Sequence, residues 1–212
     1  MKRKRVKTPL AQFHSKSFIV KEPLGVVLIM SPWNYPFMLA LDPLIGAIGA
    51  GNCVIIKPAS YAKSTSNIIK KIVTECFDER YIAVVTGGRE ENSELLEQRF
   101  DHIFFIGSVE VGKVVNEKAS KYLTPTTLEL GGKSPCIIDE SANLKLAAKS
   151  LAFGKFLNVG QTCVAPDYVL IQKNVKERFL EYFKNEIKTM YGAEPLKNDL
   201  YGHKSMKNIS IV

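Results

Sequence analysis

The stretch Leu24-Gly25-Val26-Val27-Leu28-Ile29-Met30 decides the fold of this 212-residue chain. It is a continuous apolar run between Pro23 and Pro32, with no polar residue to face water. Half-exposed strands alternate apolar and polar residues, whereas the strands of a parallel sheet are covered on both faces and read as unbroken apolar runs. The run therefore predicts a buried strand of a parallel sheet.

Outward from this run, short apolar segments alternate with longer segments of helical character. Such an alternation, with helices of about 10–15 residues, predicts right-handed βαβ units around a parallel sheet. Gly51-Asn52 is expected to end the first helix, and Ser64 to cap the second. The expected strands are 18–20, 24–30, 53–57, 81–85, 102–106, 126–130, 136–139 and 168–172, and the expected helices are 37–50, 64–77, 91–99, 108–122, 144–157 and 175–191.

The composition is that of a globular protein from a reducing compartment. Apolar residues make up 46% of the chain, which is enough for a core, and charged residues make up 24%. The four cysteines are far apart, so neither a disulfide framework nor a structural zinc site is expected. No apolar segment reaches the length of about 18 residues that a membrane span needs, and the N-terminus lacks a signal-peptide core. We therefore expect a cytoplasmic protein without a metal.

The N-terminus is strongly basic and contributes much of the formal net charge of +8. One interpretation is a solvated, frayed terminus, and the other is a nucleic-acid-binding or targeting tail. No basic patch interleaved with aromatic residues follows, so a nucleic-acid-binding domain is not supported. The basic residues are Lys2, Arg3, Lys4, Arg5 and Lys7.

The stretch Asn158-Val159-Gly160-Gln161-Thr162-Cys163-Val164-Ala165-Pro166 carries a candidate nucleophile. The small residues around Cys163 let another group approach its thiol closely, and Pro166 stiffens the exit. A lone cysteine is more often a small buried apolar residue. A nucleophilic role therefore requires a general base and an oxyanion-binding donor elsewhere in the chain.

Glu129 and Asn34 are the candidates for these two roles. Glu129 lies between two leucines and is followed by two glycines, a setting in which burial would suit a general base. The alternative is a glutamate that points to solvent. Asn34 lies between two prolines and beside two aromatic residues, and a fixed amide can donate to a developing oxyanion. The alternative is a turn-forming asparagine.

Two further positions are expected at the carboxyl ends of strands, where parallel sheets bind their ligands. Lys57 could bind a phosphate or a ribose, or it could be a surface lysine that caps the strand. Gly107-Ser108 opens a helix whose backbone N–H groups could hold a pyrophosphate. The spacing to Gly112 is G-x-x-x-x-G rather than the dinucleotide fingerprint, so a turn with tight helix packing is the alternative.

Five motifs together are far more specific than any one of them. In this order they resemble the aldehyde dehydrogenase superfamily, and they are similar to its class 3 branch, which acts on fatty and aromatic aldehydes. The resemblance covers roughly residues 9–202. The motifs are Pro32-Trp33-Asn34-Tyr35-Pro36, Gly51-Asn52 to Lys57-Pro58, Phe104-Phe105-Ile106-Gly107-Ser108, Glu129-Leu130-Gly131-Gly132-Lys133-Ser134-Pro135 and Gly160-Gln161-Thr162-Cys163.

The resemblance implies a mechanism for the residues already singled out. Cys163 would attack the aldehyde carbon as a thiolate, giving a thiohemiacetal and then a thioester. Asn34 and the backbone N–H of Cys163 would hold the oxyanion, and Glu129 would activate the hydrolytic water. Hydride would pass to NAD or NADP. The cofactor would contact Lys57 and Ser60 at its adenosine ribose, and Gly107, Ser108 and Gly112 at its pyrophosphate.

The resemblance also implies an α/β fold class with two domains. Residues 1–132 would form a parallel, Rossmann-like cofactor-binding sheet, and residues 133–212 the start of a second α/β catalytic domain. Family members are about twice as long, so we expect an N-terminal portion and the C-terminal half to be absent here. That half would carry the Glu-x-Phe-Gly-Pro segment, the rest of the substrate pocket and the oligomerisation strand. Beyond Gly202 the pattern is lost.

Three hypotheses for function follow. The first is an NAD(P)-dependent dehydrogenase of a small-molecule aldehyde, a homo-oligomer in its full-length form. The second is a non-catalytic, truncated dinucleotide-binding fragment of such an enzyme, and we expect the 212-residue chain alone to be inactive. The third is a cysteine acyl-transfer enzyme that uses Cys163 and Glu129 without a cofactor, which the predicted phosphate-binding turn argues against. Ser60 stands where many NAD-preferring members have Glu.

Overall fold

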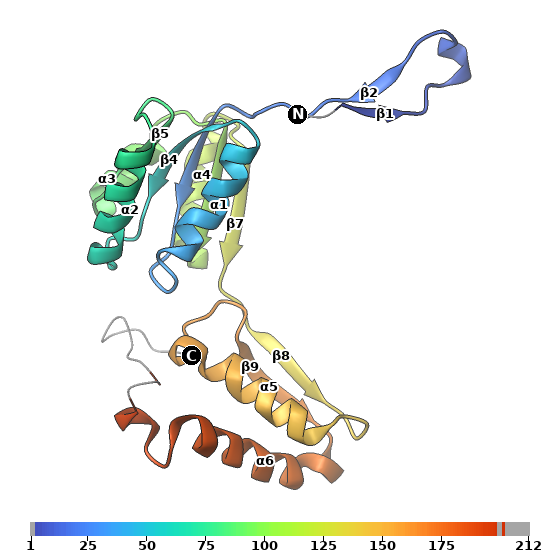
Figure 1. The fold of residues 1–212 in the computed structure, drawn as a ribbon, viewed down its shortest axis with the longest axis vertical. Coiled ribbons are helices and arrows are strands. Elements are labelled where there is room, and N and C mark those ends of the chain that lie inside the picture. Colours follow the sequence, from blue (N-terminus) through green and yellow to red (C-terminus); the bar gives the residue numbers. More distant parts are fainter. Residues whose placement is uncertain (1–2, 199–200, 202–212) are drawn as a thin grey trace. The chain divides into compact units, whose positions relative to one another are not determined.

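The computed structural model describes residues 3–198 and residue 201. The chain forms two compact units, Met1–Glu129 and Leu130–Val212, which are described separately (Figure 1). The loss of the family pattern that the sequence shows beyond Gly202 lies outside the described residues. The cofactor-binding and catalytic roles of residues 1–132 and 133–212 stay predictions.

The first unit is built on a five-stranded sheet with the order β5-β4-β3-β6-β7. β3 pairs in parallel with both β4 and β6, and β4 pairs in parallel with β5, which confirms the predicted α/β architecture. The strands are β3 (Val26–Met30), β4 (Cys53–Lys57), β5 (Ile82–Val84), β6 (His102–Gly107) and β7 (Thr126–Leu130), and the helices are α1 (Met38–Gly49), α2 (Lys63–Cys76), α3 (Arg89–Leu96) and α4 (Val109–Ser120).

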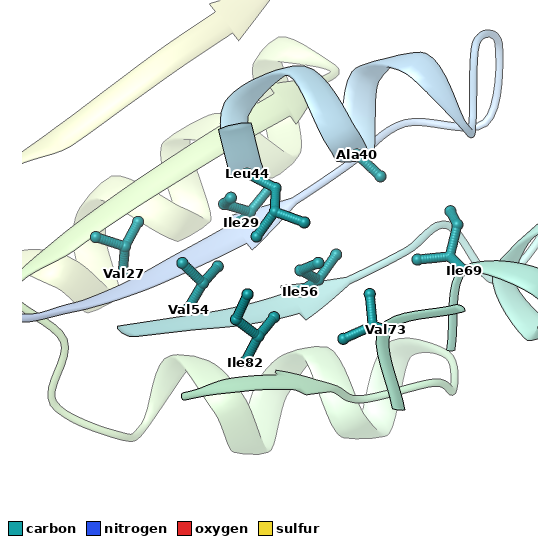
Figure 2. Packing of buried hydrophobic residues seen from close by; sticks show 9 residues of the cluster. All are labelled: Val27, Ile29, Ala40, Leu44, Val54, Ile56, Ile69, Val73 and Ile82. Atoms are coloured by element: carbon teal, nitrogen blue, oxygen red, sulfur yellow. The ribbon is translucent and has the colours of Figure 1, made fainter. Parts of the chain in front are cut away.

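The central strand β3 is covered on both faces, as its unbroken apolar run predicts. Val27 and Ile29 belong to a core that also takes in residues of α1, α2, β4 and β5 (Figure 2). Leu28 and Met30 alternate with them and are also buried, so they face the other side of the sheet. The nine buried residues of this core are Val27, Ile29, Ala40, Leu44, Val54, Ile56, Ile69, Val73 and Ile82.

The order of the strands creates a reversal point between β3 and β6. The chain runs outward from β3 to β4 and β5, and then returns to β6 on the other side of β3. The two central strands pair with Met30 opposite Phe105, so their carboxyl ends adjoin. Open α/β sheets bind ligands at such a point, because the loops leave the two strands in opposite directions. The loops here carry Asn34 after β3 and Ser108 after β6.

Of the two helix ends predicted around α1 and α2, the structure confirms one and contradicts the other. Gly51 has a φ of 84°, a left-handed value that suits glycine, and it ends the turn after α1 as expected. The prediction that Ser64 caps α2 was wrong, since α2 begins at Lys63 with Ala62 as its N-cap residue. Ser66 instead ties α2 to the preceding turn, because its hydroxyl donates to the Ala59 carbonyl at 2.8 Å.

The basic N-terminal segment contains a small antiparallel hairpin. β1 (Lys4–Val6) pairs with β2 (Ser17–Ile19), with a 3-10 turn at Leu10–Gln12 between them. A strand near residues 18–20 was expected, but its partner was not, so the interpretation of a frayed terminus is wrong from Lys4 onward. A pairing across a 10-residue loop leaves no period in a three-residue strand such as Lys4–Val6.

The second unit pairs two parallel strands and packs two helices against them. Its core joins β8, α5 and α6 through residues such as Ile138, Ala148 and Phe179. A register shift lies between Ser134 and Pro135 in the pairing of β8 with β9. The elements are β8 (Ser134–Ile138), α5 (Leu144–Phe156), the short 3-10 segment η2 (Leu157–Gly160), β9 (Pro166–Ile171), α6 (Lys173–Tyr191) and a last 3-10 turn at Pro195–Lys197.

The outer face of the β8–β9 pair exposes apolar side chains. Ile137 is opposite Leu170, and Pro135 is opposite Tyr168. The side chain of Ile137 is 74% exposed, and Tyr168 and Leu170 are about half exposed. Contiguous apolar surface of this kind marks an interaction site or a tendency to aggregate, and a two-stranded sheet is marginally stable by itself.

We therefore expect the 212-residue chain to self-associate and to bind a dye that reports apolar surface. Replacing Ile137 and Leu170 together by lysine should lower dye fluorescence by about twofold or more, because both cross-strand partners become charged. Leu196→Lys is the matched control, since it charges an exposed leucine of the same unit that lies outside the sheet. Dye titration and sedimentation velocity measure the effect. A monodisperse wild-type monomer that binds no dye would contradict the expectation.

None of the helices at positions 3–198 is long and apolar enough to cross a membrane. Within the same range, no group of three or more His, Cys, Asp or Glu side chains is arranged to hold a metal ion.

Candidate active site

Cys163 lies at the end of an unusual left-handed turn. Asn158 and Val159 have φ values of 52° and 57°, and Gly160 continues the run with a φ of 77°. A left-handed conformation costs roughly 1–2 kcal/mol for a residue other than glycine, and it is a clear outlier for a β-branched residue such as Val159. Contacts around the turn must offset this strain, which is a pattern found at functional sites.

Short hydrogen bonds and one close approach fix the backbone around Cys163. The Thr162 N–H donates to the Gly160 carbonyl at 2.8 Å, and the Ala165 N–H donates to the Thr162 carbonyl at 3.1 Å. A Cβ atom placed on Gly132 would lie 3.1 Å from the Cys163 carbonyl oxygen, whereas one on Gly131 would meet nothing within 4 Å. Of these two glycines, Gly132 is therefore the one that lets the loop after β7 approach the cysteine closely.

A small charge cluster stands beside the cysteine turn at the start of β9. The Asp167 carboxylate lies 3.4 Å from Lys133 Nζ and 3.8 Å from Lys155 Nζ. The Asp167 carboxylate, at the start of β9, therefore connects the glycine loop before β8 with the end of α5. Sequence reasoning missed this cluster, because ion pairs between distant segments leave no local pattern.

The four cysteines differ in their surroundings, and all are free thiols. Cys53 begins β4, Cys76 is exposed at the end of α2, and burial raises the pKa of the Cys136 thiol within β8. Cys163 is half-buried. Of the four, it is the one that follows directly on the strained turn, so its backbone sets it apart from the other three.

Lys57 lies at the carboxyl end of β4, buried rather than on the surface. The residue is 3% exposed, and its Nζ donates to the Gly87 carbonyl at 2.7 Å and to the Pro58 carbonyl at 3.2 Å. Burial lowers the pKa of the ammonium group, and the nearby Glu91 carboxylate partly offsets this effect. A buried, oriented ammonium at this edge suits a donor to a polar ligand better than it suits a surface cap.

The glycine turn after β6 opens α4 as the sequence predicts. Ser108 is the N-cap residue, and its hydroxyl oxygen accepts from the Val111 N–H at 3.3 Å. Gly112 is buried in the helix, while Glu110 pairs with Lys113 on the exposed side. The exposed first turn of α4 leaves backbone N–H groups at the reversal point of the sheet.

Asn34 and Ser60 are half-buried in the loops that follow β3 and β4. Glu129 is exposed near the end of β7, so of its two interpretations the structure has the solvent-facing one. Lys57 and Gly107 are the last residues of β4 and β6, and Asn34, Ser60 and Ser108 lie in the segments that follow β3, β4 and β6, so all five belong to one edge of one sheet. Cys163 belongs to the second compact unit.

The chain is similar to known proteins over nearly its whole length. The profile of the aldehyde dehydrogenase family matches residues 2–201.

The chain belongs to the aldehyde dehydrogenase family.

Several relatives show the branch of the aldehyde dehydrogenase family to which the chain is similar. A 4,4'-diaponeurosporen-aldehyde dehydrogenase of Staphylococcus aureus is 49% identical over 201 residues, which cover 95% of this chain and 44% of that protein. The aldehyde dehydrogenase family 3 member A2 of Macaca fascicularis is 48% identical, over 89% of this chain and 39% of that protein. A dog relative described as dimeric and NADP-preferring is 45% identical, over 92% and 43%.

A solved structure supports the same placement in the aldehyde dehydrogenase family. The substrate-bound state of Staphylococcus aureus AldH superimposes with a TM-score of 0.93 at 48% identity, over 97% of this chain and 45% of that one. The resemblance to class 3 enzymes and the α/β fold class are thereby confirmed. The chain spans less than half the length of these relatives.

Proposed function

We propose that this chain carries the nucleophile and much of the cofactor site of an enzyme that oxidises an aldehyde to a carboxylic acid with NAD or NADP. The observation that carries the proposal is the position of Cys163 shortly after a strained left-handed turn, in a chain of this family. Strain that the surroundings maintain is typical of residues with a mechanistic task.

Each step of the proposed oxidation is assigned to one of the residues above. The Cys163 thiolate attacks the aldehyde carbon and forms a C–S bond, which leaves a negative oxygen. The Asn34 side-chain amide and the Cys163 backbone N–H donate to this oxygen. A bound nicotinamide would supply the hydride acceptor, so that loss of hydride from the thiohemiacetal carbon gives a thioester. Glu129 then removes a proton from a water molecule that attacks the thioester carbon, and cleavage of the C–S bond releases the carboxylic acid and returns the Cys163 thiolate. The exposure of Glu129 gives it access to water.

The residues at the sheet edge fit a dinucleotide. A pyrophosphate is an anion that helix N-termini bind through backbone N–H groups, and the first turn of α4 offers such groups beside Gly107 and Ser108. The buried ammonium of Lys57 lies at the end of β4, and the hydroxyl of Ser60 lies in the turn that follows. We propose that these two groups hold a ribose of the dinucleotide. Gly112 is one of the buried residues of α4.

The remaining partners are proposed from the relatives. The substrate is a small-molecule aldehyde, and the complete protein is a homo-oligomer; the dog relative is named as dimeric, which supports this proposal. A cytoplasmic location rests on free thiols and the absence of a disulfide framework in the sequence.

The alternative is a non-catalytic dinucleotide-binding fragment, favoured by the apolar face of β8–β9 and by the share of the relatives that the chain spans. A chimera separates the two functions. In it, residues 2–201 of this chain replace the matching segment of the Staphylococcus aureus relative. We expect aldehyde-dependent reduction of NAD or NADP by the chimera, and background rates from the 212-residue chain. A stably folded chimera without turnover would refute the proposed activity, and cofactor-free ester hydrolysis would favour an acyl-transfer enzyme.

A further inference from the structure

The side chain of Gln161 closes the left-handed turn before Cys163. It is 6% exposed, one of the few buried polar residues in the described part of the chain. Its Nε2 donates to the Asn158 carbonyl at 2.9 Å, and its own backbone N–H donates to the same oxygen at 3.0 Å. Asn158 is the first residue of the strained turn. Two donors of Gln161 therefore bind the carbonyl oxygen at the start of this turn.

We infer that Gln161 is a positioning residue, which holds Asn158 and Val159 in the left-handed conformation and thereby sets the place of the Cys163 thiol. The inference rests on the proposed role of Cys163, but it concerns the geometry of the thiol and not the turnover of an aldehyde.

The physical reason lies in the competition between strain and hydrogen bonding. Val159 gains by leaving its φ of 57°, because its branched Cβ crowds the backbone there. Leaving that conformation moves the Asn158 carbonyl away from Gln161 and breaks the two hydrogen bonds that this residue donates to it, one of them from a buried side chain. The amide therefore opposes the relaxation.

The test measures alkylation of Cys163 by iodoacetamide in the 212-residue chain, with each cysteine peptide quantified by mass spectrometry. Gln161→Met keeps the volume and removes the donor, so the turn relaxes and the half-buried thiol becomes more accessible. We expect the rate of alkylation at Cys163 to rise by roughly tenfold, because a tenfold change corresponds to the free energy that one strained left-handed residue stores. The rates at Cys53 and Cys136 should stay unchanged.

A second substitution tests the route through the turn. Val159→Gly removes the strain, so by itself it should change the rate little, and in the Gln161→Met background it should bring the rate back towards wild type. A residue that merely fills space would give additive effects, which would overturn the inference. Gln161→Leu, which has a similar volume and no side-chain donor, provides a second variant if the methionine variant does not fold.

Ser66→Ala is the matched control for stability. It removes another buried side-chain bond to a carbonyl, that of Ala59, in the other compact unit. It should leave the Cys163 rate unaltered. An unchanged rate in folded Gln161→Met and Gln161→Leu would refute the inference. Loss of activity in a Cys163 variant of the chimera bears only on the proposed function, so the two failures are distinguishable.

Discussion

Replacing Cys163 by alanine should lower the rate of aldehyde oxidation by the chimera by at least about 10³-fold, equivalent to about 4 kcal/mol of activation free energy. No other described thiol follows the left-handed turn, and without the thiolate no covalent intermediate forms with the aldehyde. The kcat for aldehyde oxidation measures the effect, and the Kd for the cofactor should stay within about twofold of wild type, because the residues that we propose to contact the nucleotide lie in the first unit.

Cys76→Ala is the control for this substitution. Cys76 is an exposed thiol at the end of α2, so its loss should leave kcat unaltered. Cys163→Ser should resemble Cys163→Ala, because an unactivated hydroxyl is a much weaker nucleophile than a thiolate. Substantial turnover by Cys163→Ala would show that another group attacks the aldehyde.

Replacing Ser60 by glutamate should shift cofactor preference from NADP towards NAD. Ser60 lies in the turn between β4 and α2, which is fixed by the bond from Ser66 to Ala59. Two negative groups about 4 Å apart disfavour each other by roughly 1–4 kcal/mol. A glutamate there would repel a 2′-phosphate, whereas the serine hydroxyl and the Lys57 ammonium can donate hydrogen bonds to the oxygens of such a phosphate. The wild-type chimera should therefore accept NADP at least as well as NAD.

The measurement is kcat/KM of the chimera for both cofactors. Ser60→Glu should lower the value for NADP by about tenfold or more and change the value for NAD less. Tyr61→Glu places the same charge on the next, exposed residue of the turn and should change the ratio little. A strong preference of the wild type for NAD, or an unchanged ratio in Ser60→Glu, would show that residue 60 does not read the 2′ position.

Much of the fold follows from the sequence because its signals are local. The unbroken run at β3 requires cover on both faces, and β4 and β7 were predicted with the bounds that the structure has. Gly107-Ser108 was placed at a strand–helix junction, since a glycine and an N-cap serine act on their immediate neighbours. The resemblance to aldehyde dehydrogenases rests on the same kind of local information, namely short motifs in a fixed order.

Features that depend on distant segments were decided by the tertiary structure alone. A loop of ten residues separates β2 from its partner β1, and the Asp167 cluster joins three segments, so neither leaves a period in the sequence. The exposure of Glu129 could not be chosen over its burial, because both fit an alternating strand.

Lys57 and Gln161 show the same division most clearly. The sequence by itself determined which residue types stand at the strand end and beside the cysteine. Whether an amine or an amide there is buried, and which carbonyl oxygen it meets, depends on packing that brings Gly87 to Lys57 and bends residues 158–160 into a left-handed turn. Burial makes such polar groups consequential, because an unpaired donor in the interior costs far more than one in water.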